Sequence, residues 1–242
     1  MAINKVYESF DEAIADMKDG AVILLGGFGG IAPVPQNLIL ALSRRGLKNL
    51  TIVTNNAGGD GRIGIGNIGG KSYVDHEILV KNGQVRKFIG AVPASIVFSR
   101  PNAFEGLYRQ GKIELEVVPQ GTLAERIRAG GAGIGAFYTP TGAGTVVEEG
   151  KEKRTINGRE MLMEYALRGD YALIRAHKAD TMGNLIYKGV MRTFNALMAT
   201  AADIVVAEVD EIVEPGELDP EIIVTPGIFV SRIVETSKGE VK

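Results

Sequence analysis

Apolar and polar positions divide the beginning of the chain into short helical and strand-like segments. The apolar residues of segment 9–17 recur at helical spacing, and Ser9 with Glu12 forms a capping box, which predicts a helix. Residues 21–25 are a continuous apolar run, which is typical of a buried strand. A helix with proline near its first turn is predicted over residues 36–42, and a second strand over residues 50–54.

Strand, helix and strand in this order form a βαβ unit, which implies parallel pairing through a right-handed crossover. Similar apolar runs predict further strands at residues 85–89, 113–118, 171–176, 184–187, 204–209 and 228–234. Further helices are predicted over residues 122–129 and near residues 194–202. The chain is therefore predicted to be an α/β protein.

Three segments do not follow this pattern. Residues 58–70 are too rich in glycine to assign to an element. Residues 148–154 are polar, and we interpret them as an excursion loop within one domain because the strand pattern resumes after them. The polar tail at residues 236–242 is expected to fray.

Composition excludes several classes of function. The net charge is −2 and the basic residues are scattered, so no nucleic-acid footprint is expected. The chain has no cysteine, which excludes disulfides, thiol nucleophiles and thiolate metal sites, and is compatible with the cytoplasm. No run of about 18 apolar residues occurs, and no apolar segment follows the first residues, so neither a membrane span nor a secretory signal is expected.

Glycine is over-represented, with 32 of 242 residues, and one cluster lies between the first strand and the second helix. A helix start after glycines is a natural anion site. Residues 27–32 also fit G-x-G-x-x-A, the dinucleotide fingerprint. However, prolines crowd the helix start, and the second strand ends in Asn55 and Asn56 without the acidic residue that binds a ribose. A simple tight turn is a further alternative.

A longer pattern resembles a known family, the A subunits of family I 3-oxoacid CoA-transferases. The strongest match begins at Pro119 and reads PQGTLAERIRAGGAG. The other matching segments are residues 19–20, 26–29, 54–58, 136–142, 144–145, 178–180, 183–184, 194–195, 208–209 and 211–213. The resemblance covers nearly the whole chain, and implies a single domain over residues 1–242 with an open, mostly parallel sheet flanked by helices.

The resemblance also implies an activity and a partner. Such enzymes move CoA from an acyl-CoA, typically succinyl-CoA or acetyl-CoA, to a free carboxylate such as a 3-oxoacid. They work by a ping-pong mechanism through a glutamyl-CoA thioester, and the attacking Glu lies on a separate B subunit. We therefore expect an A2B2 assembly, with CoA thioester as a substrate and no tightly bound cofactor.

The residues themselves agree with a nucleophile on another chain. There is no G-x-S-x-G motif, and His76 and His177 have neither a serine partner nor metal-ligand spacing. Glu125 lies inside a predicted helix, while Glu211 and Glu214 flank an apolar pair and are interpreted as solvated or capping. No acidic residue stands in a glycine-framed turn, so no catalytic residue and no metal site are predicted in this chain.

Neutral side chains remain for recognition. Asn55 and Gln120 each follow a predicted strand, at the edge where α/β proteins bind ligands, and an amide can donate to a carboxylate or keto oxygen. In the resembled family the matching residues face the bound acid; the alternative is that both only cap loops. We expect the glycine loop to form a wall for CoA or its acyl group, through residues Gly26, Gly27, Phe28, Gly29 and Gly30.

The chain departs from the family pattern in two places. The family usually has GGFGxxGxP after the first strand, and here the loop is one residue longer. A more polar family block is replaced by the apolar segment 88–95, which suggests a shift towards a bulkier acyl group. Two other functions remain open for this fold, a non-catalytic small-molecule sensor and a sugar-phosphate isomerase, but the first lacks a DNA-binding segment and the second an acidic or histidine dyad.

Overall fold

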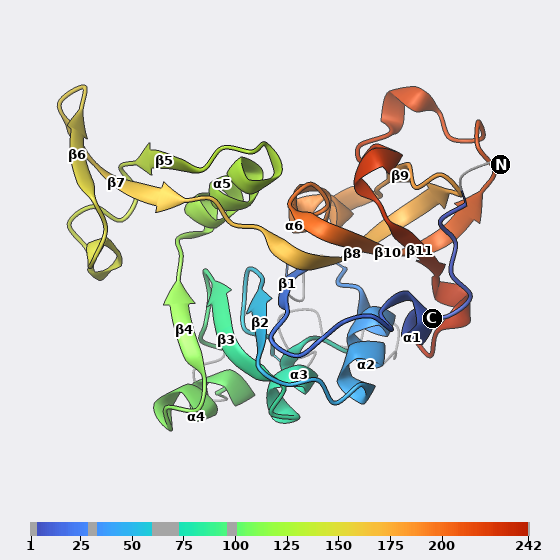
Figure 1. Ribbon diagram of the computed structural model, residues 1–242, viewed down its shortest axis with the longest axis horizontal. Helices are drawn as coiled ribbons and strands as arrows, with labels where there is room; N and C mark the ends of the chain where they lie inside the picture. The colour runs from blue at the N-terminus through green and yellow to red at the C-terminus, as the bar shows by residue number, and fades with distance from the viewer. Residues whose placement is uncertain (1–3, 29–32, 60–72, 96–100, 242) are drawn as a thin grey trace.

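The computed structural model describes residues 4–28, 33–59, 73–95 and 101–241. Its main feature is an eight-stranded sheet in the order β11-β10-β8-β1-β2-β3-β4, with β9 beside β8 (Figure 1). All pairs are parallel except β8 with β9. The strands are β1 (Val22–Leu25), β2 (Leu50–Val53), β3 (Val85–Gly90), β4 (Glu114–Val117), β8 (Gly169–Asp180), β9 (Leu185–Ile186), β10 (Ala202–Val213) and β11 (Arg232–Glu235). The predicted open, mostly parallel α/β sheet is confirmed.

The strand order reverses at the centre of the sheet. Strands β1 to β4 follow one another outwards on one side of β1, and the chain then returns to place β8, β10 and β11 on the other side. Open α/β sheets bind ligands outside the carboxyl ends of the strands at such a reversal. The carboxyl ends of β1 and β8 are therefore the first place to look for a site, and the loops that leave β2 and β4 lie along the same edge of the sheet.

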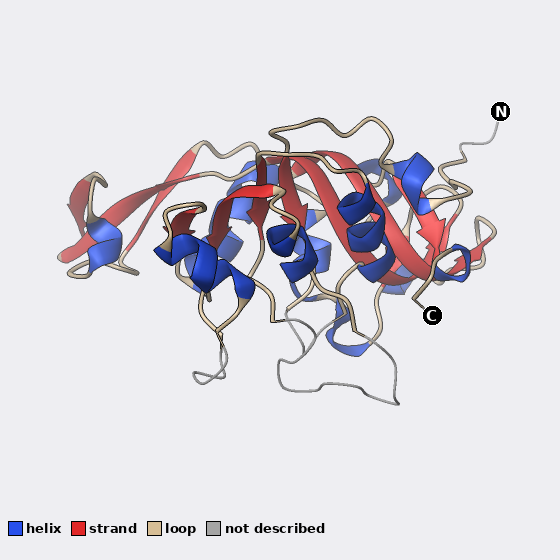
Figure 2. Ribbon diagram, turned by 90° about the horizontal axis from the view of Figure 1, so that it is seen from below, coloured by secondary structure: helices blue, strands red, loops and turns tan. Residues whose placement is uncertain are grey.

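Helices cover both faces of the sheet (Figure 2). The helices are α1 (Phe10–Ala13), α2 (Gln36–Arg44), α3 (Glu77–Lys81), α4 (Ala103–Arg109), α5 (Gln120–Gly131) and α6 (Thr193–Met198). Residues of α1 to α4 share one apolar cluster with Ile23 and Leu25, whereas α5 and α6 share the other with Leu24. Alternate residues of β1 thus enter opposite cores, which is why its sequence is apolar throughout. None of the described helices is long and apolar enough to cross a bilayer.

A second sheet of three antiparallel strands projects from one end of the molecule, and we call it the arm (Figures 1 and 2). Its strands are β5 (Ala136–Thr139), β6 (Lys153–Ile156) and β7 (Arg159–Tyr165). The expected loop at residues 148–154 is wrong in its last residues, because β6 begins there. Asn157 and Gly158 both have positive φ, 51° and 75°, and make the tight turn that pairs β6 with β7.

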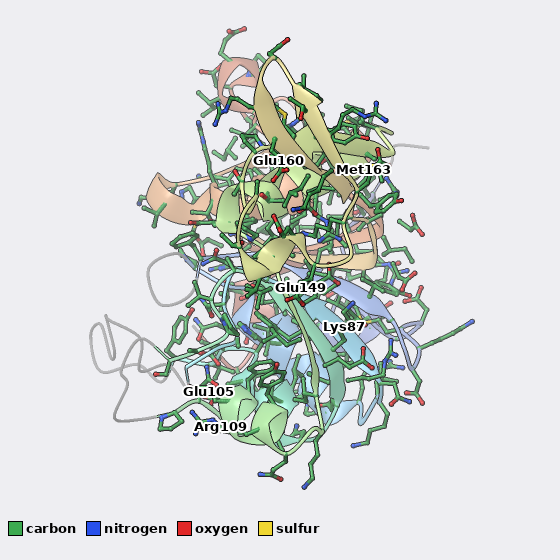
Figure 3. The ribbon with its side chains drawn as sticks, turned by 90° about the vertical axis from the view of Figure 1, so that its left-hand side faces the viewer. Lys87, Glu105, Arg109, Glu149, Glu160 and Met163 are labelled. Atoms are coloured by element: carbon green, nitrogen blue, oxygen red, sulfur yellow. The ribbon has the colours of Figure 1, made fainter. Side chains whose placement is uncertain are left out.

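The arm is attached beside the β4 edge of the main sheet. The Arg126 guanidinium of α5 donates through Nε to the Tyr165 carbonyl at 2.9 Å and through Nη1 to Glu116 of β4 at 2.7 Å. Figure 3 views this end of the molecule, with Glu160 and Met163 of the arm above Lys87 of the main sheet.

The other predicted elements agree with the structure except near their ends. The predicted strand 228–234 is wrong in its first half, because Gly227–Phe229 is a 3₁₀ turn and β11 begins at Arg232. The predicted helix 194–202 ends earlier, at Met198, since Ala202 already belongs to β10. Most of the segment 58–70 lies outside the described residues.

The tail does not follow the expected fraying. Val241 donates its backbone N–H to Asn37 Oδ1 at 2.8 Å and accepts from Asn37 Nδ2 at 2.9 Å. Lys238 and Glu240 form ion pairs with Glu8 and Arg44. A polar composition predicted a free end, but the polar groups are paired with the surface around α2.

Candidate functional site

The chain leaves β1 through glycines that lie close to other backbone. Gly26 donates its N–H to the Leu173 carbonyl of β8 at 2.9 Å. Gly27 has a φ of 107°, a conformation that residues with a side chain rarely adopt. The predicted CoA-binding residues Gly29 and Gly30 lie outside the described residues.

Phe28 forms one wall of an open pocket. Its ring stacks on Phe194 of α6 with centroids 6.3 Å apart and an interplanar angle of 13°. The pocket has a volume of about 400 Å³ and is lined by Phe28, Gln120, Gly121, Ala124, Thr193, Phe194 and Leu197. Two predicted site residues, Phe28 and Gln120, therefore line one mostly apolar pocket. The sequence did not predict Phe194 as a site residue.

Gln120 is the first residue of α5 and brings the positive end of this helix to the pocket. Pro119 is the N-cap residue and has no side-chain hydrogen bond, and no acidic residue lies in the first turn. The first amide of this turn used within the helix is that of Leu123, which donates to Pro119 at 2.8 Å. Thr122 Oγ1 is buried without a hydrogen-bond partner among the described residues. A neutral amide and a helix start suit a carboxylate or a developing oxyanion.

Asn55 lies at the same edge of the sheet but two strands from Gln120. It follows β2, whereas Gln120 follows β4, and β3 lies between them, which separates their strands by roughly 10 Å. The Asn55 carbonyl accepts from the amides of Ala91 and Val92. Its side chain is buried, and Oδ1 has no partner among the described residues. Asn55 is not one of the residues that line the pocket of Phe28 and Gln120.

The start of α2, which the sequence presented as an anion site, already holds a carboxylate of this chain. Glu208 of β10 accepts from the Asn37 amide at 2.9 Å, the Leu38 amide at 3.2 Å and Asn37 Nδ2 at 3.1 Å. A dinucleotide pyrophosphate would need the same N–H groups. The dinucleotide hypothesis is therefore not supported at this helix.

Glu208 is a buried acidic residue that the sequence did not indicate as a site residue. Burial raises the pKa of its carboxyl to about 7, while Arg175, 3.8 Å away, and the α2 amides act in the opposite direction. The signal in the sequence was a single acidic residue within the apolar run 204–209. Its carboxylate faces α2, where it accepts hydrogen bonds from Asn37 and Leu38.

Both histidines are held by neighbouring groups of the fold. His76 Nε2 lies 2.8 Å from the Asn56 carbonyl, and His177 Nδ1 lies 2.9 Å from Asp210 Oδ2. Asp210 also binds Arg175, which links this pair to Glu208. Within the described residues no cluster has the composition of a metal site.

The other acidic residues weighed in the sequence lie at the surface. Glu125 binds Arg128 within α5, and Glu211 binds Lys178 of β8. Glu214 is exposed at the end of β10 and accepts through its backbone carbonyl from Glu217. None of them lines the pocket of Phe28 and Gln120.

Comparison with known proteins points to one family. The profile of the family described as Coenzyme A transferase matches residues 7–236. The chain is 50% identical over 235 residues to the A subunit of 3-oxoadipate CoA-transferase from Pseudomonas putida, covering 97% of this chain and 95% of the relative. It is 46% identical to the A subunit of succinyl-CoA:3-ketoacid coenzyme A transferase from Helicobacter pylori strain J99, covering 98% and 95%.

The fold is shared with a solved structure of a larger chain. The acyl-CoA transferase YdiF of Escherichia coli O157:H7, solved as a thioester complex with CoA, matches with a TM-score of 0.81 and 24% identity. The match covers 99% of this chain and 50% of that chain, so this chain spans half the length of that enzyme.

Proposed function

The chain belongs to the coenzyme A transferase family, and we propose that it is the A subunit of an enzyme that moves CoA between an acyl-CoA and a free 3-oxocarboxylate. The full-length similarity to relatives named as A subunits supports this assignment. The observation that carries the division of labour is the composition of the pocket. Gln120, Thr193 and otherwise apolar residues line it, and none of its described lining residues has a carboxyl group.

In this proposal a glutamate of a separate B subunit is the nucleophile. Its carboxylate attacks the thioester carbonyl, CoA thiolate leaves, and the thiolate then attacks the resulting anhydride, which releases the first acid and forms glutamyl-CoA. The second acid takes CoA by the reverse steps. Each step needs donors for an oxyanion and a wall that excludes water from the anhydride.

The proposed contribution of this chain is recognition. The Gln120 amide and the first turn of α5 donate to the carboxylate or oxyanion, and Asn55 donates from the end of β2. The apolar wall of the pocket follows the loop of Gly26, Gly27 and Phe28. There Phe28 and Phe194 contact the acyl or pantetheine part of the substrate. The chain itself forms no covalent intermediate.

The proposed assembly and substrates follow from the relatives. The names of the relatives, 3-oxoadipate and succinyl-CoA:3-ketoacid CoA-transferase, support a 3-oxoacid as acceptor and a short acyl-CoA as donor. We propose that the chain folds as one domain with its arm and works in the cytoplasm as part of an A2B2 heterotetramer. CoA is a substrate in this scheme, and no tightly bound cofactor takes part.

Reconstitution tests this proposal. The chain is expressed alone and with its cognate B chain, and CoA transfer from succinyl-CoA to acetoacetate and to 3-oxoadipate is measured. We expect activity only in the mixture, and mass spectrometry of enzyme stopped during turnover with succinyl-CoA should find CoA attached to B. Turnover by the isolated chain, or a CoA adduct on one of its own carboxyl groups, would refute the division of labour.

A further inference from the structure

Asn195 joins four segments that surround the glycine loop. It is fully buried in α6, directly after the pocket residue Phe194. Its Oδ1 accepts from the Arg175 amide of β8 at 2.9 Å. Its Nδ2 donates to the Pro33 carbonyl at 3.2 Å and to the Met191 carbonyl at 2.8 Å. The Oδ1 atom and both N–H groups of this amide are thus used on backbone atoms, one in the turn before α6 and two far away in the sequence.

The fourth contact is with Gly26, where the loop between β1 and α2 begins; Pro33 lies near its end. A Cβ atom on Gly26 would lie 2.0 Å from Asn195 Oδ1 and 3.2 Å from the Asn195 Cα atom. The glycine therefore leaves the space that the amide occupies. Gly26 and Pro33, the residues that bracket Phe28, both contact the same side chain.

We infer that Asn195 is a positioning residue for the substrate pocket, holding the Phe28 wall against Phe194. This inference rests on the proposed function and assigns a role within that site. Phe194 and Leu197 of α6 face the pocket, and Asn195 on the same helix anchors the chain that carries Phe28. The two aromatic rings stack only if α6 and the loop keep their relative position.

The expected effect is on substrate binding rather than on chemistry. The reacting carboxylate belongs to the partner chain in the proposed mechanism, so loosening the wall leaves the nucleophile in place. Removing the amide should raise the KM for succinyl-CoA about tenfold and change kcat by less than about threefold, the scale of one or two buried hydrogen bonds. A purely structural role would instead lower the active fraction, and therefore kcat, without moving KM.

The test uses the reconstituted enzyme with Asn195→Ala, Gly26→Ala and the double variant. Gly26→Ala should be the least stable, because it forces a methyl group onto the amide. The double variant should recover stability, since the space is vacated, but should keep the raised KM because the hydrogen bonds to Arg175, Pro33 and Met191 are still missing. If Asn195→Ala fails to fold, Asn195→Asp keeps the shape and the acceptor, but as a carboxylate it loses both donated bonds and places an oxygen against the Pro33 and Met191 carbonyls.

The matched control is Asn184→Ala. Asn184 donates to Asp180 at 2.7 Å and accepts from the Gly227 amide at 2.8 Å, and it does not line the pocket. It should lose stability and keep the wild-type KM. A wild-type KM in Asn195→Ala or Asn195→Asp would overturn the inference, whereas an inactive wild-type mixture would instead refute the proposed function.

Discussion

Glu208, near the middle of β10, places its carboxylate 2.9 Å from the backbone nitrogen of Asn37, in the first turn of α2. The helix therefore carries its own anion, bound by two of the amide groups that a ligand would need. This contact also predicts how stability depends on pH.

The free energy of unfolding should fall as pH rises from about 5 to about 8. Burial raises the pKa of Glu208 in the folded protein to about 7 from an ordinary value of 4.5, so the folded state binds more protons in this range. The stability contribution is complete below the unfolded pKa and is lost as pH rises through 7. The loss is roughly 3 kcal/mol at most.

The measurement is urea unfolding of wild type and Glu208→Gln at pH 5.5 and pH 8. Gln keeps the shape but does not titrate, so the stability of Glu208→Gln relative to wild type should increase with pH. Equal pH slopes in the two proteins would mean that Glu208 is ionised throughout this range.

Asp16 should show the opposite pH dependence. Its carboxylate accepts two hydrogen bonds from the Arg232 guanidinium, at 2.7 Å and 2.6 Å, which lowers its pKa from 3.8 to about 2. Its stabilisation is present above the unfolded pKa and is lost as pH falls through 2. Because about half of the Asp16 side chain is exposed, Asp16→Asn should cost only about 1 kcal/mol at pH 7.

Comparing Asp16→Asn with wild type at pH 7 and pH 2.5 tests this. The difference should shrink at the lower pH. Arg232→Lys keeps the charge but loses the paired hydrogen bonds. Its free energy of unfolding at pH 7 should therefore lie between those of wild type and Asp16→Asn. A difference that does not change with pH would assign the effect to packing.

Removing the Gln120 amide should impair catalysis without unfolding the chain. The side chain is exposed at the pocket, so little stability depends on it. If the amide donates to an oxyanion, Gln120→Ala in the reconstituted enzyme should lower kcat by about 10²-fold. Gln110→Ala, an exposed glutamine at the end of α4, is the matched control and should retain full activity. Unchanged kcat in Gln120→Ala would leave α5 with a binding role only.

Gly130→Ala should destabilise the chain although alanine favours helices. A Cβ atom on Gly130 of α5 would lie 2.2 Å from the Leu167 carbonyl, so the helix would have to move, at a cost of about 1–3 kcal/mol. Gly106→Ala in α4 is the control, because no atom lies within 4 Å of its added Cβ, and it should stabilise by about 0.5–1 kcal/mol. Thermal melting of both variants checks the pair; a stabilised Gly130→Ala would show that α5 is not held against the chain before β8.

Local patterns predicted the central strands β1 and β2 of the main sheet because these strands are covered on both faces. The apolar run 21–25 predicted a buried strand, and β1 forms there with its residues in two cores. The arm was missed because its strands are not covered in this way. β6 is largely exposed and polar, so its sequence lacks the alternation that marks a strand, and the turn made by Asn157 and Gly158 was not predicted.

The positions of Asn55 and Gln120 at the carboxyl edge follow from the strand ends alone, since both strands are parallel and each residue lies within three positions of the end of one. That Gln120 shares a pocket with Phe194, and that Glu208 occupies the start of α2, depends on the order of strands in the sheet. That order places β8 beside β1 and β10 beside β8, and it arises from long-range packing of many residues, which no local spacing in the chain encodes.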